Sequence, residues 1–221
     1  TTDYWKGVLE AFLYSLGGIA VLNLARIVVD KVVLYKFETE KEIIEEQNSG
    51  SGAVEFGVYV AVALVIAAST AASGGTQLGT TAPTVLDSLA RTLAFFGLGM
   101  VLLVLYALFY QLTTSFDMHE EIEKKNTAVG VALGGNLIAV SVVAFKAVFG
   151  EFEGWAESLA SFLTFAVLGF VLLYVVRLLV DVALLPGTRV SHELAVDRNL
   201  GVAFIESGVV ISAALILYFA I

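Results

Sequence analysis

Two sets of ionisable side chains stand out inside apolar stretches as the groups best placed to do chemistry. They are Arg26, Asp30 and Glu55, and Arg177, Asp181 and Glu206. A charge at a bilayer centre costs about 2.5 to 3.5 kcal/mol on insertion scales, so each group needs a partner, water or a function. Arg26 and Asp30 lie four residues apart, on one helical face, and Arg177 and Asp181 repeat that spacing. Carboxylates in such surroundings can bind a proton or a small cation.

Composition indicates which elements position these groups. The chain has 221 residues, of which 58% are hydrophobic and 15% charged, whereas a soluble domain has about 25% charged residues. Apolar runs occur at 8–30, 53–72, 86–114, 127–147, 156–184 and 200–221. Each run is long enough to cross a hydrocarbon core, which takes roughly 20 residues. We therefore predict an all-α, polytopic membrane helix bundle with six transmembrane helices, forming a single membrane domain over 1–221.

Several classes of function find no support in the sequence. The net charge of −9 argues against nucleic acid, because a binder needs clustered Lys and Arg. There is no Cys, and we expect His119 and His192 to be solvated in loops rather than to bind metal. No phosphate loop, Ser-His-Asp set or zincin motif is present. We expect no enzymatic activity, cofactor or metal site, and the lipid bilayer as the surrounding partner.

The distribution of basic residues predicts the orientation. Seven lie in the loops after the first, third and fifth runs: Lys31, Lys36, Lys41, Lys124, Lys125, Arg189 and Arg198. Three lie on the other side, namely Lys6, Arg91 and Lys146. By the positive-inside rule, the first set is cytoplasmic and both termini are extracytoplasmic.

One pattern occurs three times along the chain. A Glu precedes an Asn by six residues at Glu42 and Asn48, at Glu120 and Asn126, and at Glu193 and Asn199. Asn is among the best helix N-caps, and each Asn stands just before an apolar run, so we expect capping. A docking site for a basic partner is the alternative for the Glu. The pattern predicts three parallel two-helix repeats, at approximately 1–72, 86–147 and 156–221.

Six glycines share this repeating frame. Three align in the first, third and fifth runs, and three follow the repeated Asn by nine residues: Gly18, Gly99 and Gly169, then Gly57, Gly135 and Gly208. Because helices in lipid associate through close van der Waals contact, we expect these glycines to lie where helices pack together. Asn136, inside the fourth run, is expected to bond a neighbouring helix.

The run from Glu120 to Gly135, EEIEKKNTAVGVALGG, resembles the signature of the bacterial domain of unknown function 350, the YjfL-like inner-membrane proteins. The resemblance covers nearly the whole chain, as three modules instead of the commoner two. It departs after the first and third Asn, where SGSGAVEFG and LGVAFIESG occur. The resemblance implies a multi-pass protein of the bacterial inner (plasma) membrane, sometimes linked to envelope stress, and it supplies no catalytic residues.

Two interpretations of function remain open. In the first, Glu55 with Arg26 and Asp30, and Glu206 with Arg177 and Asp181, face the bundle interior and move or sense protons or a small cation. (The second module replaces this set by Ala107, Gln111 and Leu133.) In the second, these clusters are self-compensating structural networks. The chain would then be a non-transporting scaffold or envelope-stress component, which assembles laterally with itself or another membrane protein, or recruits partners through acidic cytoplasmic loops.

Overall fold

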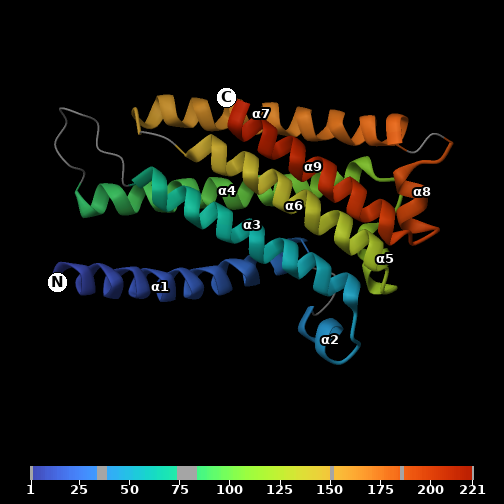
Figure 1. Ribbon diagram of the computed structural model, residues 1–221, viewed down its shortest axis with the longest axis horizontal. Coiled ribbons are helices and arrows are strands. Elements are labelled where there is room, and N and C mark those ends of the chain that lie inside the picture. Colours follow the sequence, from blue (N-terminus) through green and yellow to red (C-terminus); the bar gives the residue numbers. More distant parts are fainter. Residues whose placement is uncertain (1, 34–38, 74–83, 150–151, 185–186, 221) are drawn as a thin grey trace.

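The protein is an elongated bundle of long helices, with short helices gathered toward one end (Figure 1). The computed structural model describes residues 2–33, 39–73, 84–149, 152–184 and 187–220. Its long helices are α1 (Thr2–Val33), α3 (Ser49–Ser73), α4 (Val85–Thr113), α6 (Thr127–Val148), α7 (Trp155–Leu179) and α9 (Leu200–Ala220). The six-residue helices are α2 (Thr39–Ile44), α5 (Met118–Glu123) and α8 (Val190–Ala195).

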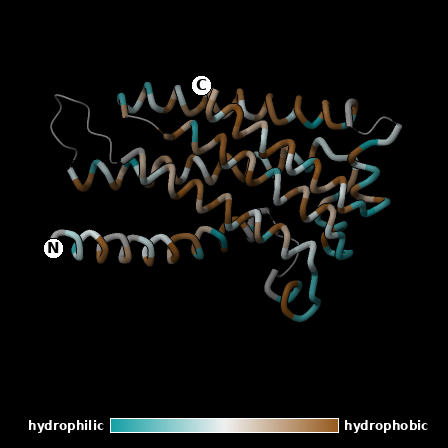
Figure 2. The backbone as a smooth tube through the Cα atoms, viewed as in Figure 1, coloured by the Kyte–Doolittle hydropathy of each residue, from teal (hydrophilic) through white to brown (hydrophobic). Residues whose placement is uncertain are grey.

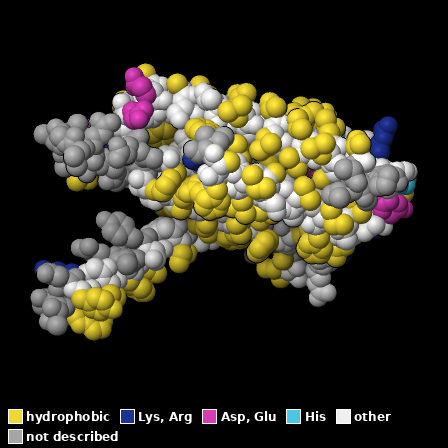
Figure 3. Space-filling model, turned by 45° about the horizontal axis from the view of Figure 1, so that its top comes forward, with side chains coloured by type: hydrophobic (Ala, Val, Ile, Leu, Met, Phe, Trp, Pro, Cys, Tyr) yellow, Lys and Arg dark blue, Asp and Glu magenta, His cyan; other side chains and the backbone are white. Residues whose placement is uncertain are grey.

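The described part of the chain is helical, and five helices are long and apolar enough to cross a membrane: α3, α4, α6, α7 and α9. In α1, the apolar segment among the described residues is Ser15–Val29. Hydrophilic residues gather at the end that holds α5 and α8, and acidic side chains lie at the two ends of the face in Figure 3 (Figures 2 and 3). The predicted all-α membrane bundle is therefore confirmed. Its division into three repeats stays a prediction, although the order long helix, short helix, long helix occurs three times.

The long helices pack in a regular order. α6 is the most deeply buried, because it packs against α3 on one side and α9 on the other. α4 contacts α3 and α6, and α7 contacts α6 and α9. α1 contacts α3 and α4, and its first half diverges from the rest of the bundle (Figure 1).

Each of α3, α6 and α9 begins in the same way. The residue before the repeated Asn has a left-handed backbone, with φ of 53° at Gln47, 61° at Lys125 and 49° at Arg198. The Asn side-chain oxygen then accepts backbone N–H groups of the first helical turn, as an N-cap does. The left-handed residue ends the short helix and turns the chain into the long one, so the polar turn and the apolar helix form one local unit.

The helices also differ in how they end. α7 continues into a π-helical turn, η1 (Val180–Leu184), which contains Asp181. π-helical turns are rare and frequently mark functional positions. This turn brings Asp181 to the start of α8, where its Oδ1 accepts the backbone N–H of Val190 at 2.7 Å.

Candidate functional site

Glu206 lies at the centre of a buried polar network between α4, α6, α7 and α9. It follows the start of α9 by two turns, so it lies about 10 Å below the polar end of the bundle. Its side chain is 0% exposed. The neighbouring polar groups come from the other three helices, so sequence-distant segments build the site together: Tyr106, Tyr110 and Thr113 from α4, Asn136 from α6 and Arg177 from α7.

All the polar contacts of the Glu206 carboxyl converge on Oε1. Asn136 donates its Nδ2 at 3.3 Å and Tyr110 its hydroxyl at 3.4 Å, while the Nε of Arg177 lies 3.6 Å away. Oε2 is buried and has no hydrogen-bond partner within the described part of the chain, a state it shares with Ser51 Oγ. An unpartnered carboxylate oxygen in a low-dielectric interior is costly, and adding a proton removes that cost.

Arg177 is held by groups other than Glu206. Its Nη1 donates to Thr113 Oγ1 at 3.0 Å, and its guanidinium carbon lies 4.5 Å from the centroid of the Tyr110 ring. A cation over an aromatic face is stabilised by the ring quadrupole, most strongly when desolvated. Arg177 therefore keeps favourable partners whether Glu206 is ionised or neutral.

The network extends along one face of α4. Tyr106, Tyr110 and Thr113 are spaced four and three residues apart, which places them on one helical side. The Tyr106 hydroxyl donates to Asn136 Oδ1 at 2.9 Å, and Asn136 in turn donates to Glu206. The network thus spans two turns of α4, about 10 Å along the helix axis.

The first module has a different arrangement. Arg26 forms two hydrogen bonds with Glu55, from Nε to Oε2 at 2.8 Å and from Nη2 to Oε1 at 3.0 Å. The Glu55 side chain is 6% exposed and that of Arg26 25%. This bidentate geometry satisfies both carboxylate oxygens, so the pair is closed. The matching spacing in the sequence therefore does not produce matching sites.

Of the two aspartates predicted in these clusters, Asp181 forms its hydrogen bond elsewhere. Asp181 bonds to the backbone of Val190. Gln111, at the same place in the second module, accepts the Met118 N–H at 2.9 Å, so both side chains hold the start of the following short helix. Asp30 lies in α1, but its side chain lies outside the described residues.

The repeated Asn residues do more than cap their own helices. Asn48 Nδ2 donates to Glu42 Oε2 and to the backbone oxygen of Ile122, each at 2.7 Å. Asn126 Nδ2 bonds Glu121 Oε2 at 3.0 Å and the backbone oxygen of Leu194 at 2.9 Å. Asn48 and Asn126 thus tie each module to the short helix of the next one. Asn199 bonds Glu193 at 2.9 Å.

The polar end departs from the sequence repeat at one position and from a prediction at another. In the second module Asn126 donates to Glu121, five residues before it, whereas Asn48 and Asn199 donate to Glu residues six positions before them. The spacing shortens there by one residue, and Glu120 instead pairs with Lys124 at 2.9 Å on the surface. His119 is 6% exposed rather than solvated, with its Nδ1 3.5 Å from Asp117 Oδ1, whereas His192 is exposed.

The glycine predictions divide in the same way. A methyl group on Gly57 would strike the backbone of Gly134, and one on Gly135 would strike Ser207. Gly99 packs on Val65, and Gly169 on Val143. These four glycines therefore lie at helix contacts. Gly18 and Gly208 have no described atom within 4 Å of an added Cβ, so within one chain the contact prediction is wrong for them.

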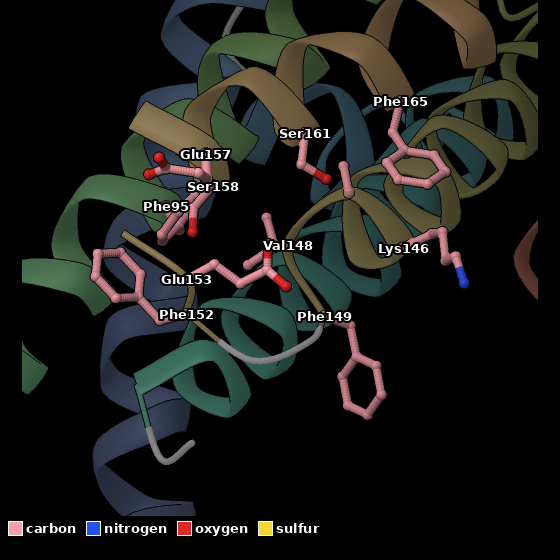
Figure 4. A pocket seen from close by; sticks show the side chains of 11 residues that line it. Phe95, Lys146, Val148, Phe149, Phe152, Glu153, Glu157, Ser158, Ser161 and Phe165 are labelled. Atoms are coloured by element: carbon pink, nitrogen blue, oxygen red, sulfur yellow. The ribbon is translucent and has the colours of Figure 1, made fainter. Parts of the chain in front are cut away.

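Three hollows lie away from Glu55 and Glu206. One of about 1070 Å³ lies between the middle of α1, α3 and α4, and one of about 390 Å³ lies between α7 and α9. The third, of about 250 Å³, lies where α6 ends and α7 begins; Figure 4 shows Glu153 crossing it and Lys146 pointing away. Neither Glu55 nor Glu206 lines any of the three.

Sequence reasoning found Arg177 and Glu206 but missed three of their partners. Tyr106, Tyr110 and Thr113 were part of an apolar run, where aromatic residues are normally lipid-facing or core residues. Their signal was the four-and-three spacing of hydroxyl groups on one side of a transmembrane helix.

Fold and site together define a multi-pass helical membrane protein with ion-paired carboxylates inside the bundle. The model of the Domain of Unknown Function (DUF350) family matches residues 2–70 and 84–221, and the chain belongs to this family. It is similar to a UPF0719 transmembrane protein of Aquifex aeolicus (strain VF5), with 26% identity over 214 residues, which are 96% of this chain and 76% of that protein. It is also similar to the UPF0719 transmembrane protein YshE of Bacillus subtilis (strain 168), with 28% identity over 120 residues, which are 54% of this chain and 84% of that protein. No solved structure matches the chain.

Proposed function

We propose that the protein binds and releases a proton at Glu206 and thereby moves or senses protons across the membrane. The observation that supports this proposal is the buried Oε2 of Glu206, which has no hydrogen-bond partner among the described residues, while Oε1 accepts hydrogen bonds from Asn136 and Tyr110. A proton on Oε2 would make the carboxyl neutral in a site where an ion is costly.

A metal cation fits the site less well than a proton. Hard cations take six or more oxygen ligands, or keep several waters. Around Glu206 the described groups offer few free oxygens, because Asn136 Oδ1 already accepts from Tyr106. The Arg177 guanidinium, 3.6 Å from Oε1, would also repel a cation.

The scaffold interpretation remains as a second candidate. The closed Arg26–Glu55 pair supports it, because a fully satisfied pair needs no ligand. In addition, neither Glu55 nor Glu206 lines any of the three hollows described above. Neither candidate involves an enzymatic reaction.

Infrared spectroscopy of the reconstituted protein tests the proton site directly. We expect the pH-difference spectrum to contain a carboxyl C=O component that is present in the wild type and in Glu55→Gln and is lost in Glu206→Gln. If Glu206→Gln leaves the pH-dependent band unchanged, Glu206 is not the proton site.

Proton flux into proteoliposomes then separates the two modes of action. Flux that Glu206→Gln abolishes, and that Glu55→Gln retains at equal incorporation, indicates proton movement. A titrating Glu206 band without flux above empty liposomes indicates sensing. If neither the band nor the flux depends on Glu206, the scaffold candidate is preferred.

The proposal also includes the membrane in which the protein lies and its orientation there. Its supports are the family resemblance and the excess of Lys and Arg beside α2, α5 and α8, which favour the bacterial inner membrane with both termini extracytoplasmic. Alkaline phosphatase fused after residue 221 should be active on this topology and inactive on the opposite one.

A further inference from the structure

The contacts between successive helix pairs repeat in one direction along the chain. Gly57 of α3 packs on Gly134 of α6, and Gly135 of α6 packs on Ser207 of α9. In both cases a residue nine positions after the repeated Asn meets a residue eight positions after the next one. The side-chain amides of Asn48 and Asn126 follow the same direction, to Ile122 and Leu194. In each module, we call the repeated Asn and the residue nine positions after it the forward face. We call the residues four and eight positions after that Asn the receiving face.

The other long helices repeat a second contact. Gly99 of α4 packs on Val65 of α3, with an added Cβ 3.5 Å from the Val65 Cβ. Gly169 of α7 packs on Val143 of α6, at 3.1 Å by the same measure. Val65 and Val143 each stand seventeen residues after their Asn. A glycine in the next module therefore packs on a β-branched residue at a constant position.

At the last module, the forward face has no occupant among the described residues. Gly208 has open space around it, and the β-branched Ile216, seventeen residues after Asn199, is 69% exposed. Both residues line the apolar groove of about 390 Å³ between α7 and α9. Among the described groups, the Asn199 amide donates to Glu193 alone, without the second bond to a neighbouring short helix.

At the first module, the receiving face is open in the same way. Gly52 has no described atom within 4 Å of an added Cβ, and Phe56 is 66% exposed. Gly18 of α1, which corresponds to Gly99 and Gly169, also has no described atom within 4 Å of an added Cβ and lines the hollow beside α3 and α4. The last module thus exposes a forward face and the first module a receiving face, which are the two faces that pack against each other between successive modules.

We propose that a second copy of this chain occupies the open forward face, head to tail. The α7 and α9 groove of one copy receives α1 and α3 of the next, with Gly18 on Ile216 as Gly99 lies on Val65. Phe56 lies eight positions after its Asn, as Gly134 and Ser207 do. Because Phe56 is larger, α3 of one copy lies further from α9 of the other than α6 lies from α3 within a chain. The Phe56 ring fills the space over Gly208.

Continuity with the internal contact identifies a second copy as the occupant. The exposed residues at each end have the same types and positions as residues that already pack against each other in this chain. Small residues that admit close approach are the features by which helices associate in lipid. Because the two faces differ, the contact is heterologous, and it builds rings or open rows rather than a two-fold dimer. This inference does not depend on the proton site.

Cysteine cross-linking in membranes tests the proposal against a background without native Cys. Gly18→Cys and Ile216→Cys are placed in separate, differently tagged copies that are expressed together. The equivalent internal pairs have Cβ separations of 3.1 and 3.5 Å, close to the roughly 3.5 to 4.5 Å of a disulfide. We expect a disulfide-linked pair of the two tags on oxidation, and a ladder of higher multiples when one chain carries both substitutions.

Three controls make the outcome decisive. Val65→Cys with Gly99→Cys in one chain should close an internal disulfide, and Val101→Cys with Val167→Cys, which are 55% and 62% exposed outside both faces, should not link copies. Failure of the Gly18 and Ile216 variants to link while the internal pair closes would overturn the proposal. So would linkage of Ile216→Cys to itself alone, which indicates a two-fold contact, or linkage only to a protein of another mass.

Oligomeric state gives a second measurement without cysteines. Native mass spectrometry of the wild type from nanodiscs should show multiples of the chain. Gly208→Trp, which fills the space for Phe56, should shift them to single copies, whereas Phe219→Trp, at a position 80% exposed outside both faces, should not. A wild type found only as single copies contradicts the proposal.

Discussion

Arg26 and Glu55 form a closed pair with two hydrogen bonds of 2.8 and 3.0 Å, although the same residue types at the same spacing leave Arg177 and Glu206 3.6 Å apart. The difference comes from the neighbours. Thr113 and the Tyr110 ring hold Arg177, while Asn136 and Tyr110 donate to Glu206. Two similar pairs in the sequence therefore differ in geometry: one is closed by two hydrogen bonds, and the other leaves a buried carboxylate oxygen without a described partner.

The closed pair predicts a non-additive effect on stability. Glu55→Leu removes the two hydrogen bonds that the Arg26 guanidinium donates to Glu55, and Arg26→Leu removes both donors from a buried carboxylate, so each should cost roughly 3 kcal/mol. The double variant Arg26→Leu with Glu55→Leu should recover most of this loss. Thermal unfolding in detergent, followed by circular dichroism, measures all three. Simple addition of the two single losses would show that the pair is not coupled.

Asn126 should matter more than Asn199. Asn126→Ala removes an N-cap, worth about 1 kcal/mol, and also leaves the buried Leu194 carbonyl without its donor, at a further 1 to 3 kcal/mol or so. Asn199→Ala removes the cap and the exposed bond to Glu193. The same unfolding assay on single copies in detergent compares the two variants. Equal losses would mean that the link between α6 and α8 adds nothing.

The close approach of α3 and α6 predicts a position-specific effect of one methyl group. Gly57→Ala places a Cβ against the Gly134 backbone, which cannot move aside, and overpacking of this kind costs roughly 1 to 3 kcal/mol. In single copies in detergent, Gly52→Ala in the same helix meets no described atom and should be neutral or stabilising by up to about 1 kcal/mol because Ala favours helix. The melting temperature should fall in Gly57→Ala and stay the same or rise in Gly52→Ala. An unchanged melting temperature in Gly57→Ala would contradict the contact between α3 and α6.

Glu121 predicts a pH dependence at the polar end. Burial raises its pKa, but hydrogen bonds from the Asn126 amide and the Lys124 ammonium outweigh burial and hold the pKa of Glu121 below its usual value. The ionised carboxylate therefore stabilises the fold above the ordinary pKa of about 4.5, and this contribution is lost as pH falls through the lower folded value.

We expect Glu121→Gln to lower the melting temperature at neutral pH. On acidification below about pH 4.5, the melting temperature of this variant should fall less than that of the wild type. Glu123→Gln, at an exposed position of the same short helix, is the matched control. Parallel curves for the wild type and Glu121→Gln would rule out this contribution.

Much of the fold was predictable from local features of the sequence. Apolar length predicts membrane helices because the cost of transferring a residue into lipid depends mainly on its own side chain. The repeated Asn predicts helix starts because capping bonds reach two or three residues along the chain. These properties need no knowledge of distant segments, so the boundaries of α4, α6 and α9 agree closely with the apolar runs.

Partners across helices were decided by the tertiary structure. Spacing alone suggested that Asp181 joins Arg177, but the π-helical turn directs Asp181 to Val190, and the one-residue shortening in the second module exchanges Glu120 for Glu121. Likewise, six glycines looked equivalent, yet Gly18 and Gly208 lie at the open ends of the helix row. Helix order, rotation and tilt determine which side chains meet, because a contact across helices depends on packing of segments far apart in the sequence. By itself, the sequence determined the membrane class, the helices and their caps; the tertiary structure decided that Glu206, not Glu55, keeps a carboxylate oxygen without a partner in the described part of the chain.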